Sequence, residues 1–187
     1  MSRSIYWFRN DIRLEDNEAL LKAAAATEEV VPMYVLDETL LHGKQLGIER
    51  MGAFRLQFLL ESLTELKKSL IQIGSDLHFC IGDPKEEILR VSKDFSCDTL
   101  YAQAASAYEE TSLEEELAKQ LNVHFIWGET LYHLQDLPIS LAELPDTFTT
   151  FRKLVEKKSA VREAFEAPVH LNSPADFRSR VVPFGRA

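Results

Sequence analysis

The sequence contains only two cysteines, Cys80 and Cys97, among its 187 residues. Two cysteines support neither a disulfide framework nor a metal cluster, and both lie in apolar runs, so we expect buried free thiols. The chain also lacks an N-terminal apolar stretch long enough for a signal peptide or a membrane span. We therefore expect a soluble, cytoplasmic protein with no membrane contact.

Glycine is also scarce, with seven residues in the chain and none in the first strand-to-helix turn. The motifs G-x-G-x-x-G and G-x-x-x-x-G-K-[ST], whose backbone N–H groups cradle phosphates, are both absent. The G-x-S-x-G nucleophile elbow is absent as well. These absences argue against ordinary nucleotide chemistry built on a glycine-rich phosphate cradle.

Positive charge is in deficit, with 21 lysines and arginines against 30 aspartates and glutamates and a formal net charge of −9. Proteins that bind duplex DNA usually present a basic surface, so we expect no direct DNA binding by this chain. The histidines show no spacing typical of metal ligands, and we interpret them as structural or surface residues. They are His42, His78, His124, His133 and His170.

What the sequence does have is a regular alternation of strand-like and helix-like segments. Apolar runs predict five strands, at residues 5–8, 30–37, 75–82, 98–104 and 123–128. Helices are predicted between them, and Asp16 or Asn17 is a suitable N-cap for the first. This alternation is typical of a parallel sheet covered by helices on both faces. We therefore predict a doubly wound α/β fold, a Rossmann-like three-layer sandwich around a five-stranded parallel sheet in the order 3-2-1-4-5.

The strand pattern stops near residue 137, and we divide the chain there into an α/β domain (residues 2–137) and a linker segment (residues 138–187). The linker contains five of the seven prolines and one expected helix, FTTFRKLVEKKSAVREAF. We expect that helix to carry apolar side chains along one face. Exposed apolar faces tend to bind other protein surfaces, so we predict self-association through residues 151–165. The face would consist of Phe151, Leu154, Val155, Val161 and Phe165.

Further expectations concern single side chains. The long helix near residues 49–73 should bury one face that contains Met51, Phe54, Phe58, Leu63, Leu66 and Leu70. In the helix after the fourth strand, Glu114, Glu115 and Glu116 should face water. Trp7 and Trp127 are both expected in the core.

A ligand in an open α/β sheet binds beyond the carboxyl ends of the strands, where the strand order reverses. In the predicted order this point lies between the first and fourth strands. The first strand runs into Arg9, Asn10 and Asp11, and the loop after the fourth strand leads to Glu109 and Glu110. These polar residues would meet in one crevice at the carboxyl edge of the sheet.

The end of the first strand also carries a recognisable pattern. The stretch YWFRNDIRLEDNEAL resembles the opening of the photolyase/cryptochrome family, Trp-Phe-Arg-x-Asp-Leu-Arg-x-x-Asp-Asn, with Ile12 in place of leucine. Two later stretches, WGETLYHLQDLP and LPDTFTTFRKLVEKKSAVREAFEAP, are similar to the cryptochrome DASH branch. Three separated stretches thus agree in the same order over residues 5 to about 168. The sequence resembles the N-terminal, antenna-type α/β domain of that family.

The resemblance implies a role within a larger protein. Full-length relatives add a helical domain that binds FAD and DNA, and they perform light-driven repair of pyrimidine dimers or blue-light sensing. We expect this FAD-binding helical domain to be absent here and to be the chain's natural partner, so that the chain alone would hold no FAD and would not be catalytic. Its own cofactor would be an antenna pigment, methenyltetrahydrofolate or a deazaflavin.

In folate-binding relatives, a glutamate at the start of the helix after the fourth strand holds the pterin ring. Glu110 matches that position and Glu109 precedes it, and a carboxylate can accept two N–H bonds from a pterin. Alternatively, a glutamate at this position can simply be stabilised by the helix dipole, without any contact to a ligand. The expected cofactor-binding set is Glu110, Glu109, Phe8, Arg9 and Asn10. Residues 104–107, Ala-Ala-Ser-Ala, replace a polar stretch of the DASH pattern, which predicts a weakened or lost antenna site.

Two alternatives stay open. Arg9, Asp11 and Arg13 can form an ion-pair network that fixes the loop, and we favour this structural role over ligand contact. The chain can also be a stand-alone nucleotide-binding domain of stress-protein-like or adenine-nucleotide hydrolase-like type, against which the absent glycine-rich loop counts, or an interaction protein that has lost its ligand.

Overall fold

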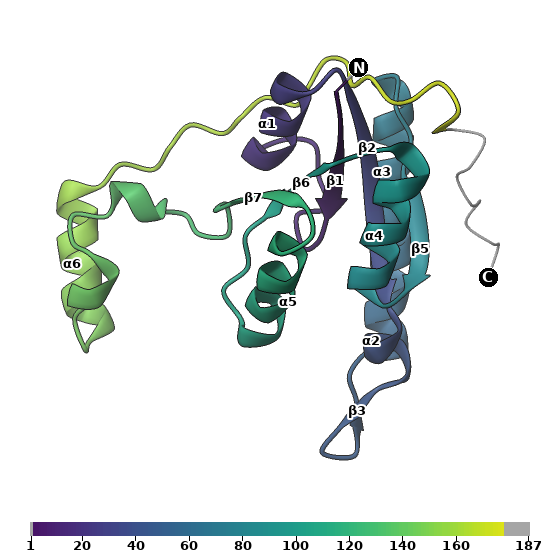
Figure 1. Cartoon of the computed structure of the whole chain (residues 1–187). Coiled ribbons are helices and arrows are strands. Elements are labelled where there is room, and N and C mark those ends of the chain that lie inside the picture. Colours follow the sequence, from purple (N-terminus) through teal and green to yellow (C-terminus); the bar gives the residue numbers. More distant parts are fainter. Residues whose placement is uncertain (1, 178–187) are drawn as a thin grey trace.

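A five-stranded parallel sheet forms the centre of the computed structural model, which describes residues 2–177 (Figure 1). Its strands are β1 (Arg3–Phe8), β2 (Glu29–Asp37), β5 (His78–Gly82), β6 (Thr99–Gln103) and β7 (Asn122–Ile126). They pair in the order β5-β2-β1-β6-β7, and every pair is parallel. Counted along the chain, this is the predicted order 3-2-1-4-5, which is therefore confirmed. The sequence did not predict the small antiparallel hairpin of β3 (Lys44–Gln45) and β4 (Ile48–Glu49).

Helices cover both faces of the sheet, as the doubly wound fold requires. The helices are α1 (Glu18–Ala26), α2 (Glu38–His42), α3 (Ala53–Gln72), α4 (Pro84–Phe95), α5 (Tyr108–Ala118) and α6 (Phe148–Lys158), with short 3₁₀ turns η1 (Leu134–Asp136) and η2 (Leu141–Glu143). Alternate residues of a strand point to opposite faces. Tyr6 and Phe8 of β1 accordingly join a first core cluster with residues of α1 and α3, and Ile5 and Trp7 join a second with residues of α4 and α5.

Local capping signals position the first and fourth helices. Asn17 is the N-cap of α1, and its side-chain oxygen accepts a hydrogen bond from the backbone N–H of Leu20 at 3.0 Å. Asp83 caps α4 in the same way, accepting from the backbone N–H of Glu86 at 3.0 Å, and Pro84 is the first helical residue. These caps begin each helix directly after its strand and loop, at the carboxyl edge of the sheet.

The buried face of α3 differs from the predicted one. Leu63, Leu66 and Leu70 are buried, but Phe54 and Phe58 are 90% and 72% exposed. At 100° per residue, Phe54 and Phe58 lie about 180° and about 140° around the helix from Leu63, so they cannot share its face. Including them in one buried stripe was therefore wrong. They form an exposed apolar edge on the outer side of α3.

The expected C-terminal helix is shorter than predicted. It ends at Lys158, and Val161 and Phe165 lie beyond it in extended chain. Asp136 holds that chain, because its backbone oxygen accepts from the Ser159 hydroxyl at 2.8 Å and its carboxylate forms an ion pair with Arg162. Tertiary contacts thus override the helical preference of this segment.

The chain after α6 returns to the α/β unit as a strap, residues 165–177, which passes the amino ends of the strands (Figure 1). The backbone oxygen of Asn172 accepts from the N–H of Val30 at 2.8 Å, and Leu171 N–H donates to the oxygen of Ile73 at 2.9 Å. Leu171 is buried in the first core cluster and Phe177 in the second. The domain division at Leu137 stays a prediction, but the chain beyond that point supplies core residues to both faces of the sheet.

Both cysteines are free thiols; Cys97 is buried and Cys80 is half-buried. Burial raises the pKa of each thiol to about 12, so both are protonated and unreactive at neutral pH. Within residues 2–177, no helix is long and apolar enough to cross a membrane.

His78 is a buried histidine enclosed by aromatic rings. Its ring centroid lies 6.1 Å from that of Phe95 and 6.5 Å from that of Phe177. Neither ring nitrogen has a hydrogen-bond partner in the part of the chain that the structure describes. Burial, with a smaller effect from Arg90, lowers the pKa of His78 below its usual value.

This histidine should make the fold sensitive to acid. Below about pH 6.5 the unfolded state takes up a proton at His78 before the folded state does, so stability should fall by up to about 1.4 kcal/mol per pH unit until the folded pKa is reached. Above that pH the contribution is constant. His78→Phe should remove this part of the pH dependence, whereas His42→Phe, at an exposed histidine, should keep it. Urea denaturation across this pH range measures the difference, and identical pH profiles for wild type and His78→Phe would contradict it.

Candidate functional site

A pocket of about 170 Å³ lies at the carboxyl edge of the sheet, where β1 and β2 end and α5 begins. We call it the edge pocket. All five residues predicted to bind a cofactor line it, together with eight others. The full lining is Trp7, Phe8, Arg9, Asn10, Tyr34, Val35, Asp37, Leu40, Arg50, Pro84, Glu109, Glu110 and Leu113. The structure therefore brings the two predicted polar clusters together.

The two adjacent glutamates of α5 have different surroundings. Glu109 forms an ion pair with Arg50 at 2.6 Å, and this contact raises the pKa of the Arg50 guanidinium. Glu110 is half-buried and makes no hydrogen bond or ion pair with the residues that the structure describes. Both lie in the first turn of α5, whose dipole favours a negative charge. Glu110 is thus the carboxylate of the pocket that is available to a ligand.

The apolar lining of the edge pocket consists of buried residues at its base and the partly exposed Tyr34, Leu40 and Leu113. Trp7 is nearly fully buried, as predicted, and Phe8 is fully buried. Tyr34 stacks on Phe79 with 6.4 Å between ring centroids, and burial raises the pKa of Tyr34 to about 12. The Tyr34 hydroxyl is therefore neutral over the physiological range. Partly exposed apolar side chains beside a carboxylate that has no ion-pair partner among the described residues suit a planar heteroaromatic ring with N–H groups on one edge.

Arg9 is fixed by three contacts. Its guanidinium lies 4.6 Å from the ring centroid of Trp7, it donates to the backbone oxygen of Gln103 at 3.2 Å, and it forms an ion pair with Glu114. Glu114 was expected to face water, but its side chain is only 13% exposed. The expectation failed because the sequence of α5 shows only a run of acidic residues. It does not show that Arg9, which follows β1, lies against Glu114 in the folded chain. Glu114 is the residue beside the pocket whose contact with Arg9 sequence reasoning missed.

Asp11 has a structural role, although the expected ion-pair network is not what the structure shows. Its buried carboxylate accepts hydrogen bonds from the Tyr6 hydroxyl, from the backbone N–H of Arg9 at 2.9 Å and from the Asn17 amide at 3.2 Å. Arg13 is exposed and bonds to the backbone oxygens of Glu15 and Asp16. In the described part of the chain, the ion pairs of Arg9 and Arg13 go to Glu114 and Asp16, not to Asp11. The network prediction was therefore wrong in its pairing.

Trp127 was expected in the core but is half-buried. Its Nε1–H donates to the Thr130 hydroxyl at 2.8 Å, and its side chain lines a separate cavity of about 260 Å³. That cavity lies between the start of α1, the end of β7 and the extended residues 161–165. Trp127 leaves the core because β7 is an edge strand and ends at Ile126, one residue earlier.

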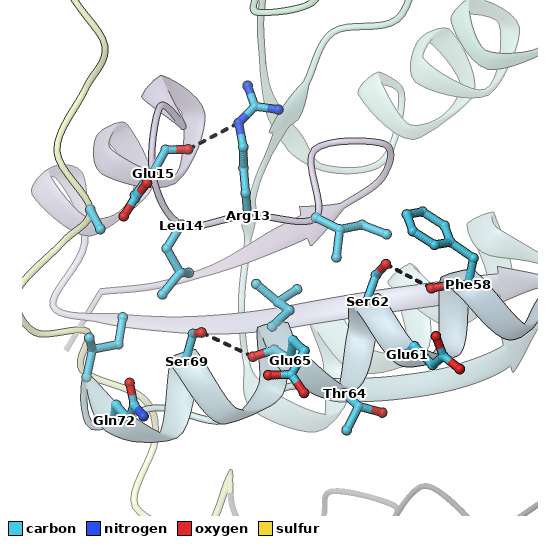
Figure 2. A pocket seen from close by; sticks show the side chains of 14 residues that line it. Arg13, Leu14, Glu15, Phe58, Glu61, Ser62, Thr64, Glu65, Ser69 and Gln72 are labelled. Carbon is cyan, nitrogen blue, oxygen red and sulfur yellow. Dashed lines mark hydrogen bonds between the residues drawn. The ribbon is translucent and has the colours of Figure 1, made fainter.

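A larger, open hollow of about 970 Å³ lies between the loop at Arg13–Glu15 and the outer side of α3 (Figure 2). The Ser62 and Ser69 hydroxyls there donate to backbone oxygens of α3 itself, and Arg13 donates to the backbone oxygen of Glu15. These polar groups are bonded within their own segments. We therefore place the candidate site at the edge pocket and not at this hollow.

The histidines do not gather into a metal site. Among residues 2–177, no group of three or more histidine, cysteine, aspartate or glutamate side chains could hold a metal ion. His42, His124 and His170 are exposed, His133 is half-buried and His78 is buried.

Several known proteins resemble this chain in sequence. A family model described as DNA photolyase matches residues 4–170. The cryptochrome DASH, chloroplastic/mitochondrial, of Oryza sativa subsp. japonica is 38% identical over 91% of this chain and 33% of its own length. The cryptochrome DASH of a Synechocystis strain is 36% identical over 89% of this chain and 35% of its own length. The chain thus spans about a third of the length of the curated relatives it matches.

Solved structures show the same architecture. The crystal structure of a cryptochrome from Synechocystis aligns with 94% of this chain and 38% of that protein, at a TM-score of 0.89 and 35% identity. A bacterial class III photolyase from Agrobacterium tumefaciens aligns with a TM-score of 0.78 at 24% identity over 100% of this chain and 37% of that protein, a likeness that shows the fold alone.

Proposed function

This chain belongs to the DNA photolyase family and corresponds to the N-terminal α/β domain of cryptochromes of the DASH type, and from that premise we propose that it holds an antenna pigment in the edge pocket. The family resemblance predicted from the sequence is confirmed. The observation that carries the proposal is Glu110, a half-buried carboxylate that lines the pocket without a hydrogen-bond or ion-pair partner among the described residues. A half-buried carboxylate in a pocket wall can accept hydrogen bonds from a ligand that carries N–H donors.

The residues of the pocket fit a pterin ring better than a whole cofactor. Pockets for drug-sized ligands usually enclose about 300–1,000 Å³, so a cavity of about 170 Å³ would hold one ring system and leave the remainder of the molecule outside. Glu110 would accept N–H bonds from the ring edge, while the half-buried Tyr34, Leu40 and Leu113 would supply the apolar contacts. When bound, such a pigment supplies light absorption. The chain's own residues would bind and orient the ring and exclude water.

Methenyltetrahydrofolate is the pigment that we favour, and a deazaflavin is the second candidate. Both present a planar heteroaromatic ring, but an edge with several N–H donors is the better match to a carboxylate. The whole family protein supplies the remaining chemistry in our proposal. A helical domain that binds FAD would be the partner of this domain, and light-driven repair of pyrimidine dimers or blue-light sensing would be the activity of the two together.

Replacement of Glu110 by glutamine should weaken binding of methenyltetrahydrofolate at least tenfold. Glutamine keeps the shape but loses the negative charge, and a hydrogen bond to a charged group contributes about 1.5–3 kcal/mol, where about 1.4 kcal/mol corresponds to tenfold. Titration of the purified chain, followed by the absorbance and fluorescence of the pterin, gives the dissociation constant. Glu115→Gln, on an exposed position of the same helix, is the matched control.

Equal affinity of wild type and Glu110→Gln would show that Glu110 is not the contact. A wild-type chain that binds neither methenyltetrahydrofolate nor a deazaflavin would contradict the antenna proposal itself. The expectations of no direct DNA binding, of a cytoplasmic location and of self-association through residues 151–165 all stay predictions. The apolar face available for self-association is smaller than the sequence indicated, because Val155 is buried within its own chain and α6 ends at Lys158.

A further inference from the structure

One carboxylate oxygen connects the two walls of the edge pocket. Glu114 Oε1 is the partner of the Arg9 guanidinium, at the end of β1, and it also accepts the backbone N–H of Ala105 at 2.9 Å. Ala105 lies in the loop that joins β6 to α5, and α5 carries Glu109 and Glu110 into the pocket. The end of β1 and the β6–α5 loop therefore meet at this oxygen, in addition to the bond from Arg9 to the backbone oxygen of Gln103 at the end of β6.

The β6–α5 loop has few other means of being held. Its residues 104–107 are Ala-Ala-Ser-Ala, and Ala107, the N-cap of α5, offers no side-chain cap. Ala104 N–H bonds to the backbone oxygen of Ile126 at 2.8 Å, which fixes the loop at its start. The Ser106 hydroxyl reaches Glu129 at 3.3 Å on the exposed surface. The backbone oxygen of Ala107 accepts from the N–H of Thr111 at 2.9 Å, and the side chain of Glu114 adds a side-chain attachment of the loop to α5.

We propose that Glu114 is a positioning residue for the edge pocket: it holds Arg9 against Trp7 and fixes the loop that places Glu110, without touching the ligand itself. This inference rests on the proposed function. Glu114 is not among the residues that line the pocket, so it acts through Arg9 and Ala105. The apolar run at residues 104–107 thus does not by itself mean a lost site, because the carboxylate of Glu114 orders a loop that has few polar side chains of its own.

The burial of the pair is what makes its loss consequential. The side chains of Arg9 and Glu114 are 10% and 13% exposed, so each charge is largely removed from water. If one partner of such a pair is removed, the other charge is left without compensation and must rearrange to reach solvent. Arg9 would leave the face of Trp7, where it contributes to the wall of the pocket.

Three variants separate positioning from general stability. Glu114→Ala removes both contacts, Glu114→Gln keeps an oxygen that can accept from Ala105 but removes the charge opposite Arg9, and Glu115→Gln changes an exposed neighbour. Amide hydrogen exchange at Ala105 reports the loop, thermal unfolding reports overall stability, and methenyltetrahydrofolate titration reports the pocket. In Glu114→Ala we expect exchange at Ala105 to accelerate and pterin affinity to fall, each about tenfold or more, since a hydrogen bond to a charged acceptor is lost.

Glu114→Gln should recover much of the protection at Ala105 but less of the affinity. In a Glu110→Gln background, Glu114→Ala should weaken binding less than it does in wild type, because both changes act on the same contact. A general loss of stability would not produce this coupling.

Unchanged exchange at Ala105 in Glu114→Ala would overturn the positioning role whether or not any ligand binds. Faster exchange with unaltered affinity, in a chain whose affinity does depend on Glu110, would make Glu114 a structural residue only and would also overturn it. A wild-type chain that binds no pterin is instead a failure of the proposed function, and the exchange measurement still decides whether Glu114 fixes the loop.

Discussion

Replacing Asp11 with alanine is expected to lower the free energy of unfolding by about 3–5 kcal/mol, because several buried polar groups lose their acceptor together. The Tyr6 hydroxyl, the Asn17 amide and the backbone N–H of Arg9 all donate to this carboxylate. Burial, together with the neighbouring Asp11, raises the pKa of Tyr6 well above its usual value, so its hydroxyl stays protonated and needs an acceptor. Each buried donor left unsatisfied costs about 1–3 kcal/mol.

The effect of Asp11→Ala should reach the first helix as well, because Asn17 both donates to Asp11 and caps α1. Urea denaturation compares it with Glu15→Ala, which removes an exposed carboxylate from the same loop and should change stability by less than about 0.5 kcal/mol. The Tyr6 hydroxyl contacts both Asp11 and, at 2.7 Å, the side-chain oxygen of Asn17, so the effects of Tyr6→Phe and Asp11→Ala should overlap. The double variant should therefore be more stable than the sum of the two single effects predicts. Similar, small losses for Asp11→Ala and Glu15→Ala would show that the buried network contributes little.

Phe177→Ala is expected to cost about 3–5 kcal/mol, the usual range for truncating a fully buried phenylalanine. The ring is inaccessible to solvent and lies 5.5 Å, between centroids, from that of Phe95, in an edge-to-face arrangement. Its loss leaves a cavity between the strap and α4, and it should release the last residues of the strap first. Thermal or urea unfolding gives the size of the effect. Hydrogen exchange at the amides of Leu171 and Val30, which donate the two backbone hydrogen bonds between the strap and the α/β unit, shows whether the strap loosens.

Val169→Ala is the matched control, because Val169 belongs to the same strap but is 94% exposed. It should be nearly neutral. If Phe177→Ala were equally neutral, the strap would be a peripheral segment and the α/β unit would be complete without it. The domain division near Leu137 would then be supported.

Much of the fold follows from patterns that are local in the sequence. Short apolar runs predicted all five parallel strands, and the cap residues Asn17 and Asp83 marked where two helices begin. Backbone pairing and side-chain alternation repeat over a few residues, so a buried strand or a capped helix leaves a signal that needs no knowledge of distant partners. The strand order follows because few topologies connect such units by right-handed crossovers. The carboxyl edge as the place of the site follows from the same topology.

The tertiary structure alone decided which charges and rings meet. In the sequence Glu114 is one of three glutamates expected to face water, and only the folded chain brings Arg9 against it. Likewise, nothing near Asp136 in the sequence indicates that it will bind Ser159 and Arg162. These contacts accompany the end of α6 at Lys158. Phe177 stands more than a hundred residues from β1 in the sequence but packs in the same core cluster as Trp7. Such pairings depend on the distances that the folded chain sets between segments. Helical and strand periodicity in the sequence cannot predict those distances, because periodicity shows only which face of a segment is apolar.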